Sequence, residues 1–184
     1  MIYIIDCGSQ LTQNIARRIR ELGVYTEIVP YHNADRIISN NYNPNNIFNN
    51  ILNTPNNLEG IIISGGQFSV YDSGAPTLDK SLLNQKVPIL GICYGQQLIA
   101  HLLGGKVSPT SSREYGETKI ILNTSSPLFH EIKDKEFNVF MSHGDVVETI
   151  PDGFKILAVS QKGHVAAIQK DKIEGVVFKL DRAI

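Results

Sequence analysis

The segment Gly91-Ile92-Cys93-Tyr94-Gly95 places a cysteine between two glycines, where an apolar run ends and a helical pattern begins. A G-x-C-x-G pattern between a strand and a helix is the thiol counterpart of the nucleophile elbow, in which a sharp turn exposes the reactive atom above the sheet. The start of the following helix favours an anion and lowers the pKa of a thiol there. The pattern therefore predicts a nucleophile at Cys93; the alternative is a small buried cysteine that fills the corner.

A thiol that attacks a carbonyl group needs hydrogen-bond donors for the oxyanion that forms. The backbone N–H of Tyr94 follows the cysteine and is the first candidate. The second is expected in a glycine-rich loop at the end of a neighbouring strand, and Gly65-Gly66 directly follows the apolar run 60–64. Paired glycines after a strand are also common in simple turns, so the prediction depends on the elbow and the loop together.

The elements that position these residues alternate between strands and helices. Short β-branched runs predict buried strands at 1–6, 24–29, 60–64, 87–92 and 174–178. Apolar residues spaced three and four apart predict helices at 9–22 and directly after Cys93. Strands separated by helices imply βαβ units, so we expect an α/β fold with a mainly parallel central sheet and helices on both faces. From residue 106 onward short strands dominate, which predicts a small, partly antiparallel layer.

The composition is typical of one soluble globular domain over residues 1–184, with a hydrophobic fraction of 42% and a charged fraction of 19%. A net charge of -1 gives no electrostatic reason to expect nucleic acid or a membrane surface as a partner. No apolar run reaches the ~18 residues of a membrane span. Cys7 and Cys93 are the only cysteines, which favours a reducing, cytoplasmic setting without disulfides. The Asn-rich stretch at about 40–57 is predicted to be a surface insertion.

Five stretches carry a resemblance to a known family: IIDCGSQLTQNIARRIRELGVYTEI, IIISGGQFSVYDSGAP, VPILGICYGQQLIAHLLGGKV, SREYGET and FMSHGDVVETIPDGF. With these stretches in order, the chain resembles the class I (triad-type) glutamine amidotransferases, whose fold is flavodoxin-like. The Cys-Tyr-Gly elbow, together with Arg-Glu-Tyr-Gly and Met-Ser-His-Gly-Asp, is similar to the GMP synthase branch of that family.

The resemblance implies that Cys93 attacks the carboxamide of glutamine, forms a γ-glutamyl thioester and releases ammonia. It implies oxyanion N–H groups from Gly66 and Tyr94. It assigns the amino-acid end of glutamine to three further residues, Gln97, Ser142 and His143. In the family the ammonia passes to a synthetase that activates XMP with ATP. No such ATP pyrophosphatase domain is recognised in this sequence, so we expect the partner to be a separate synthetase, with ATP and Mg used only there. The amidotransferase itself is expected to need no cofactor and no metal.

The family's elbow cysteine works with a histidine and a glutamate in a Phe-His-Pro-Glu motif after the last strand. This chain reads EGVVFKLDRAI, and aligning Phe178 with the motif places Lys179 at the histidine and Asp181 at the glutamate. A lysine amine with an ordinary pKa near ~10.4 stays protonated, whereas an imidazole near ~6.5 accepts and returns protons at neutral pH. We therefore expect an impaired or inactive glutaminase, either a degenerate family member or a chain with a shortened C-terminal end.

Three interpretations compete. The first is an amidotransferase subunit of GMP synthase, and the second is a non-catalytic binding or regulatory module that keeps the glutamine pocket. The third is a cysteine-elbow protein of the protease and chaperone type, which Tyr94 disfavours because those proteins usually carry histidine after the cysteine. His143 is the best candidate to replace the missing histidine, although in the family it coexists with that histidine. His164 is expected to be structural.

Overall fold

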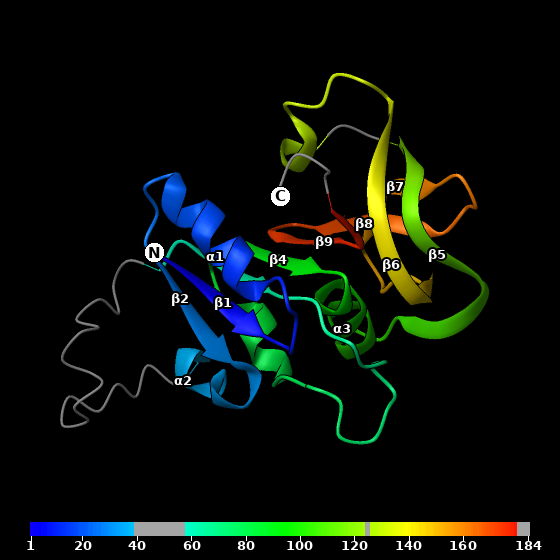
Figure 1. Cartoon of the computed structure of the whole chain (residues 1–184). Helices are drawn as coiled ribbons and strands as arrows, with labels where there is room; N and C mark the ends of the chain where they lie inside the picture. Colours follow the sequence, from blue (N-terminus) through cyan, green and yellow to red (C-terminus); the bar gives the residue numbers. More distant parts are fainter. Residues whose placement is uncertain (39–57, 124–125, 180–184) are drawn as a thin grey trace, which may run out of the picture.

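The computed structural model describes residues 1–38, 58–123 and 126–179 (Figure 1). The strands, in chain order, are β1 (Ile2–Asp6), β2 (Thr26–Pro30), β3 (Gly60–Ile63), β4 (Ile89–Ile92), β5 (Lys106–Leu122), β6 (Glu136–Thr149), β7 (Lys155–Ser160), β8 (Val165–Lys170), β9 (Ile173–Val176) and β10 (Phe178–Lys179). The α-helices are α1 (Thr12–Glu21), α2 (Asp35–Ile38) and α3 (Tyr94–Leu102). Short 3-10 turns are η1 (Tyr31–Asn33), η3 (Lys80–Asn84) and η4 (Pro127–Phe129). No helix in the described ranges is long and apolar enough to cross a membrane.

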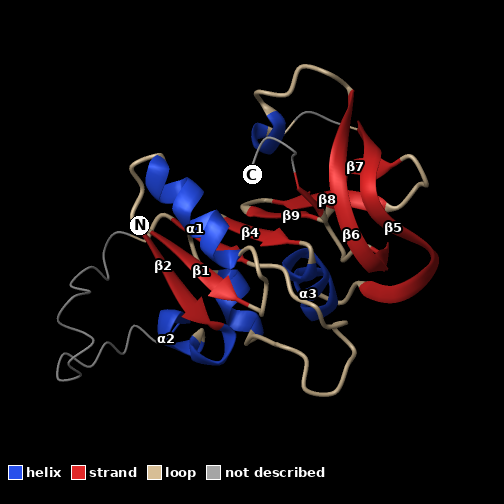
Figure 2. Cartoon of the chain, viewed as in Figure 1, coloured by secondary structure: helices blue, strands red, loops and turns tan. Residues whose placement is uncertain are grey.

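The strands form one sheet in the order β10-β6-β5-β7-β8-β9-β4-β3-β1-β2. Strands β2, β1, β3, β4 and β9 pair in parallel. The ladders from β9 through β8, β7, β5 and β6 to β10 are antiparallel. Figure 2 shows the long strands β5 and β6 standing at one end of the sheet, beyond the parallel part. The predicted α/β fold, a parallel central sheet extended by antiparallel strands, is confirmed.

Both faces of the parallel part are covered. Successive residues of a strand point to opposite faces, and Ile4 and Ile5 of β1 are each 0% exposed. Ile5 shares a core cluster with Leu98 and Ile99 of α3. Helix α1 contacts β1 and β2, and the right-handed crossover between these two strands places it on the opposite face. Figure 2 shows α1 and α3 on either side of the parallel strands.

The structure corrects two expectations about the second half of the chain. The single strand predicted at 174–178 is two strands, because the chain leaves β4 after Val176 and joins β6 at Phe178. The prediction that short strands dominate after residue 106 holds for β7, β8, β9 and β10 but is wrong for β5 and β6, which span 17 and 14 residues. A register irregularity between Pro109 and Glu114 interrupts β5, and this breaks the alternation that would have revealed its length. The predicted insertion at 40–57 lies outside the described residues.

Candidate active site

Cys93 lies at the turn between β4 and α3, in a backbone conformation that few side chains adopt. Its φ of 52° and ψ of −109° fall where L-residues are strained, at a cost of about 1–3 kcal/mol. Its N–H donates to the carbonyl of Val176 at 2.7 Å. Its Sγ lies 3.5 Å from the carbonyl oxygen of Val177. The chain at the end of β9 therefore supports the elbow and holds the strained cysteine in place.

The two glycines of the elbow are required by close backbone contacts. A Cβ on Gly95 would lie 2.2 Å from the carbonyl oxygen of Ile63 in β3. A Cβ on Gly91 would lie 2.6 Å from the carbonyl oxygen of Gly95. Real Cβ atoms do not approach so closely, so only glycine lets α3 begin directly against the parallel strands. The sequence pattern thus has the steric cause that the elbow interpretation requires.

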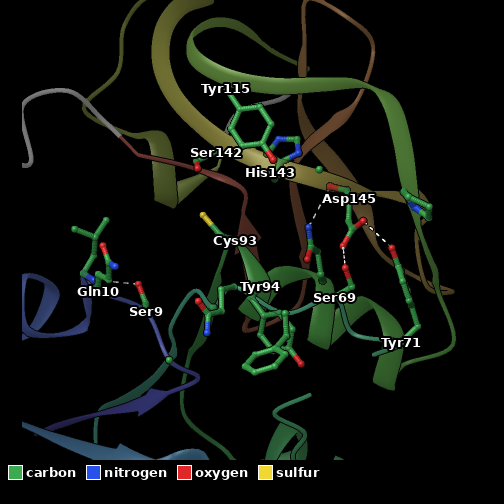
Figure 3. Close-up of a pocket in the computed structure, with 18 residues that line it drawn as sticks. Ser9, Gln10, Ser69, Tyr71, Cys93, Tyr94, Tyr115, Ser142, His143 and Asp145 are labelled. Carbon is green, nitrogen blue, oxygen red and sulfur yellow. Dashed lines mark hydrogen bonds between the residues drawn. The ribbon is translucent and has the colours of Figure 1, made fainter. Parts of the chain in front are cut away.

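A pocket of about 660 Å³ opens above Cys93 (Figure 3). It lies where β1, β3 and β4 end, as ligand sites do in open α/β sheets. The long strands β5 and β6 supply its remaining wall. The predicted site residues that line it are Gly66, Cys93, Tyr94, Gln97, Ser142 and His143. The structure therefore brings these six residues together around one pocket, while their chemical roles stay predictions.

The two candidate oxyanion donors lie beside the cysteine. A Cβ on Gly65 would be 3.6 Å from the Cβ of Cys93, and one on Gly66 would be 3.4 Å from the ring of Tyr94. Gly66 also approaches the carbonyl oxygen of Cys7 so closely that a Cβ would lie 2.7 Å from it. The buried Tyr94 hydroxyl donates to the carbonyl of Pro76, which ties the end of the glycine loop to α3.

The two predicted triad positions differ in what the structure describes. The backbone of Lys179 is paired with Phe140 of β6, two residues after Val177 and its contact with the Cys93 sulfur. Asp181 lies outside the described residues.

Asp145 is a site residue that sequence reasoning missed, because in isolation it could equally cap a turn. Its carboxylate accepts hydrogen bonds from the hydroxyls of Ser69 and Tyr71, the latter at 2.7 Å. Its backbone carbonyl accepts from Gln97 Nε2 at 3.1 Å. Asp145 therefore joins the loop after β3, strand β6 and helix α3, and it is the one carboxylate among the described residues that line the pocket. Its position two residues after the predicted His143 was the available signal.

The loop after β1 was also missed, although its place at the end of a parallel strand could have pointed to it. Residues 8–11 line the pocket on the side opposite β6. The hydroxyl of Ser9 accepts from the N–H of Leu11 at 3.1 Å, and Asp6 holds the loop by accepting from Thr12 Oγ1 at 2.9 Å. This loop, which follows β1, presents polar groups to the pocket.

The electrostatic environments of Cys7 and His143 have clear causes. Burial, followed by the charge of Asp6, raises the pKa of the Cys7 thiol to about 12, which leaves this thiol unreactive. Burial also lowers the pKa of His143, against the opposing effect of Glu114. His143 is therefore neutral at neutral pH. Among the described residues, no group of three or more His, Cys, Asp and Glu side chains is arranged to hold a metal ion.

Comparisons with known proteins identify the relatives of this chain. The family model of glutamine amidotransferase class-I matches residues 3–178. The GMP synthase [glutamine-hydrolyzing] of Borreliella burgdorferi strain N40 is 47% identical over 180 residues, covering 96% of this chain and 32% of the relative. The protein of the same name from Clostridium perfringens is 44% identical over 181 residues, covering 97% of this chain and 32% of the relative. The chain thus spans about a third of the length of these curated relatives.

A solved structure agrees with these sequence matches. The crystal structure of a putative GMP synthase subunit from Thermoplasma acidophilum has a TM-score of 0.74 and 29% sequence identity. The match covers 96% of this chain and 82% of that one.

Proposed function

This chain belongs to the class-I glutamine amidotransferase family, and we propose that it binds glutamine and releases ammonia from it through a thioester on Cys93. The observation that carries the proposal is the strained elbow beneath a pocket of about 660 Å³. A residue other than glycine persists at φ 52° only where the surrounding structure enforces it, and such strain is concentrated at functional sites.

In the proposed reaction, the sulfur of Cys93 attacks the amide carbon of glutamine. As the C–S bond forms, negative charge moves to the amide oxygen, where the N–H groups of Gly66 and Tyr94 receive it. The intermediate then breaks its C–N bond, and the nitrogen takes up a proton and leaves as ammonia. Water cleaves the thioester to give glutamate and restores the thiol. The thiol proton and the proton on the leaving nitrogen both need a carrier.

The pocket offers groups for the amino-acid end of glutamine. Gln97, Ser142 and His143 are the family's positions for this end. Asp145 adds the negative charge that an α-ammonium group needs, because it is the one carboxylate among the described residues of the pocket lining. An ammonium seated there would compete with the hydroxyls of Ser69 and Tyr71 that now bond this carboxylate.

We further propose that turnover is slow, because the position of the proton carrier holds Lys179. Lys179 stands two residues after Val177, whose carbonyl contacts the Cys93 sulfur, and its backbone pairs with Phe140 of β6. The backbone of residue 179 is therefore close in sequence to the residue that contacts the elbow. A protonated amine can donate to the leaving nitrogen but does not take a proton from water. Loss of general acid–base catalysis reduces rates by ~10²–10⁴. Asp181, aligned with the family glutamate, is one methylene shorter.

The proposed acceptor of the ammonia is XMP, activated by an ATP pyrophosphatase domain or subunit that uses ATP and Mg. This proposal is supported by relatives named GMP synthase [glutamine-hydrolyzing], of whose length this chain covers 32%. In this proposal the chain works in the cytoplasm, where the thiol of Cys93 stays reduced.

The substitution at Lys179 favours a second candidate, a catalytically inactive module that binds glutamine and regulates a partner. One experiment separates the two. Ammonia and glutamate release is measured for the purified chain, for Cys93→Ala and for Lys179→His, each with and without an XMP-activating synthetase, ATP and Mg. The glutaminase proposal expects weak release by the chain, none by Cys93→Ala, and a rise of ~10² or more in Lys179→His.

Equal release by the chain and by Cys93→Ala would refute the thioester. Release unaltered by Lys179→His would refute the impairment. If even Lys179→His releases no ammonia, the glutaminase proposal fails, and calorimetric binding of glutamine to Cys93→Ala then decides for or against the binding module.

A further inference from the structure

A buried carboxylate lies behind the wall of the pocket. Glu114 of β5 stands directly opposite His143 of β6 in the strand register, and its side chain is 0% exposed. Its Oε2 atom lies 3.0 Å from Nδ1 of His164 and 3.5 Å from Nε2 of His143. His164 belongs to the turn between β7 and β8. One carboxylate oxygen therefore connects the two long strands with that turn.

The chemistry of this cluster favours contact between the carboxylate and the two imidazoles. An ionised carboxylate is costly to bury unless it is paired and hydrogen-bonded, and it can only accept hydrogen bonds. Burial lowers the pKa of His143, with His164 acting in the same direction and Glu114 and Asp145 against it. Nε2 of His143 faces two groups, Oε2 of Glu114 at 3.5 Å and Sδ of Met141 at 3.3 Å. Its Nδ1 atom and Oε1 of Glu114 are buried without a hydrogen-bond partner among the described residues.

His164 is held on its far side as well. Its Nε2 lies 3.0 Å from Oγ of Ser112, and its backbone N–H donates to Oγ of Ser160 at 3.3 Å. Ser112 lies in the irregular part of β5 between Pro109 and Glu114. The cluster thus fastens a stretch of β5 that the ladder to β6 does not hold in regular register.

The cluster reaches the pocket through His143. This residue is part of the segment 142–145, which lines the pocket. Within the segment, the carbonyl of Asp145 accepts from Gln97 Nε2 at 3.1 Å, and Gln97 stands on α3 four residues after Cys93. A shift of the His143 ring therefore moves both the pocket wall and the partner of Gln97.

We propose that Glu114 is a positioning residue of the glutamine pocket: its buried carboxylate clamps His143 and His164 and so sets the position of the segment 142–145. The inference rests on the proposed function, since it names glutamine as the ligand. Removal of the charge by Glu114→Gln loosens the clamp and weakens glutamine binding about tenfold, which corresponds to about 1.4 kcal/mol. His164→Ala, which removes one partner of the clamp outside the pocket, weakens it in the same direction by a smaller factor.

The test measures calorimetric affinity for glutamine in a Cys93→Ala background, where no turnover occurs. Two controls accompany Glu114→Gln. Glu117→Gln changes an exposed carboxylate on the same strand, which accepts a hydrogen bond from Asn138 at 2.7 Å. Val139→Ala truncates a core side chain of β6 that is 0% exposed and destabilises the fold without touching the cluster. Both controls should bind glutamine as the parent does.

Glutamine affinity in Glu114→Gln equal to that of the parent overturns the proposal. A loss shared with Val139→Ala also overturns it, because general destabilisation would then explain the loss. If Glu114→Gln does not fold, His164→Ala takes its place under the same criteria. If the parent binds no glutamine, the proposed function fails, and the clamp is judged by backbone NMR: shifts of the amides 142–145 in Glu114→Gln but not in Glu117→Gln support it, and unchanged amides refute it.

Discussion

Replacing Cys93 by glycine should leave this protein more stable than replacing it by alanine, although both changes remove the nucleophile. The cysteine is held at φ 52° and ψ −109°, a region that glycine occupies without strain. Alanine keeps the Cβ atom and therefore keeps the strain. The difference between Cys93→Gly and Cys93→Ala isolates the backbone term, because both variants lack the sulfur and its contact with Val177.

The size of the effect follows from two opposing contributions. Relief of backbone strain stabilises the glycine variant by about 1–3 kcal/mol. The greater flexibility of glycine in the unfolded chain offsets about 0.5–1 kcal/mol of that gain. The net expectation is that the free energy of unfolding is about 1 kcal/mol higher for Cys93→Gly than for Cys93→Ala. In a domain of this size, that difference raises the melting temperature by about 2–4 °C.

The assay is urea denaturation at neutral pH, with the midpoint and slope fitted for both variants. Asp171 offers a second comparison, since it also has φ 52° but is a residue type that tolerates positive φ better. Asp171→Gly should therefore gain less than Cys93→Gly does. A Cys93→Gly variant less stable than Cys93→Ala would refute the claim that the elbow stores strain.

Three further predictions concern packing, thiol reactivity and pH. Gly95→Ala should destabilise the fold by more than about 3 kcal/mol in urea denaturation, because its Cβ would lie 2.2 Å from a carbonyl oxygen of β3. Gly60→Ala is the control, since its Cβ would meet only an ordinary contact at 3.5 Å and should be tolerated. A thiol reagent at pH 8 should label Cys93 and spare Cys7 in the folded chain, and peptide mass spectrometry identifies the labelled site. Labelling of both cysteines under native conditions would contradict the burial of Cys7. The folded-state pKa of His143 is lowered from 6.5, so the unfolded chain binds a proton on this imidazole more readily than the folded chain does. The contribution of His143 to stability should be full above pH 6.5 and fall as the pH decreases below it. A denaturation midpoint with the same pH dependence in His143→Gln would refute this.

The elbow could be predicted from sequence because all of its determinants are local. Two glycines around a cysteine, an apolar run before them and a helical stripe after them lie within a few residues of one another, and each has a direct steric reason. The structure agrees with this part in detail, including the positive φ of Cys93 and the close contact of Gly95. Gly66 joins the site for a similar reason, since parallel strands bring their carboxyl ends to one edge.

The second half of the chain was harder to predict, because its strand partners are distant in sequence. Residues 174–178, Glu-Gly-Val-Val-Phe, suggest a single strand, yet β9 pairs with β4 and β10 with β6. Nothing within the run marks the change of partner at Val177. The length of β5 was hidden because a register irregularity between Pro109 and Glu114 breaks its alternation.

The α/β class, the cysteine elbow and the glycine loop beside it could be predicted from the sequence, because short-range sterics and hydrophobic periodicity decide these features. Which polar side chains meet depends on how the whole chain folds. Asp145 reaches Ser69 across 76 positions of the chain, and Glu114 reaches His164 across 50. Such pairs depend on strand order and register, which are set by the packing of the whole sheet and leave no mark in the residues adjacent to either partner.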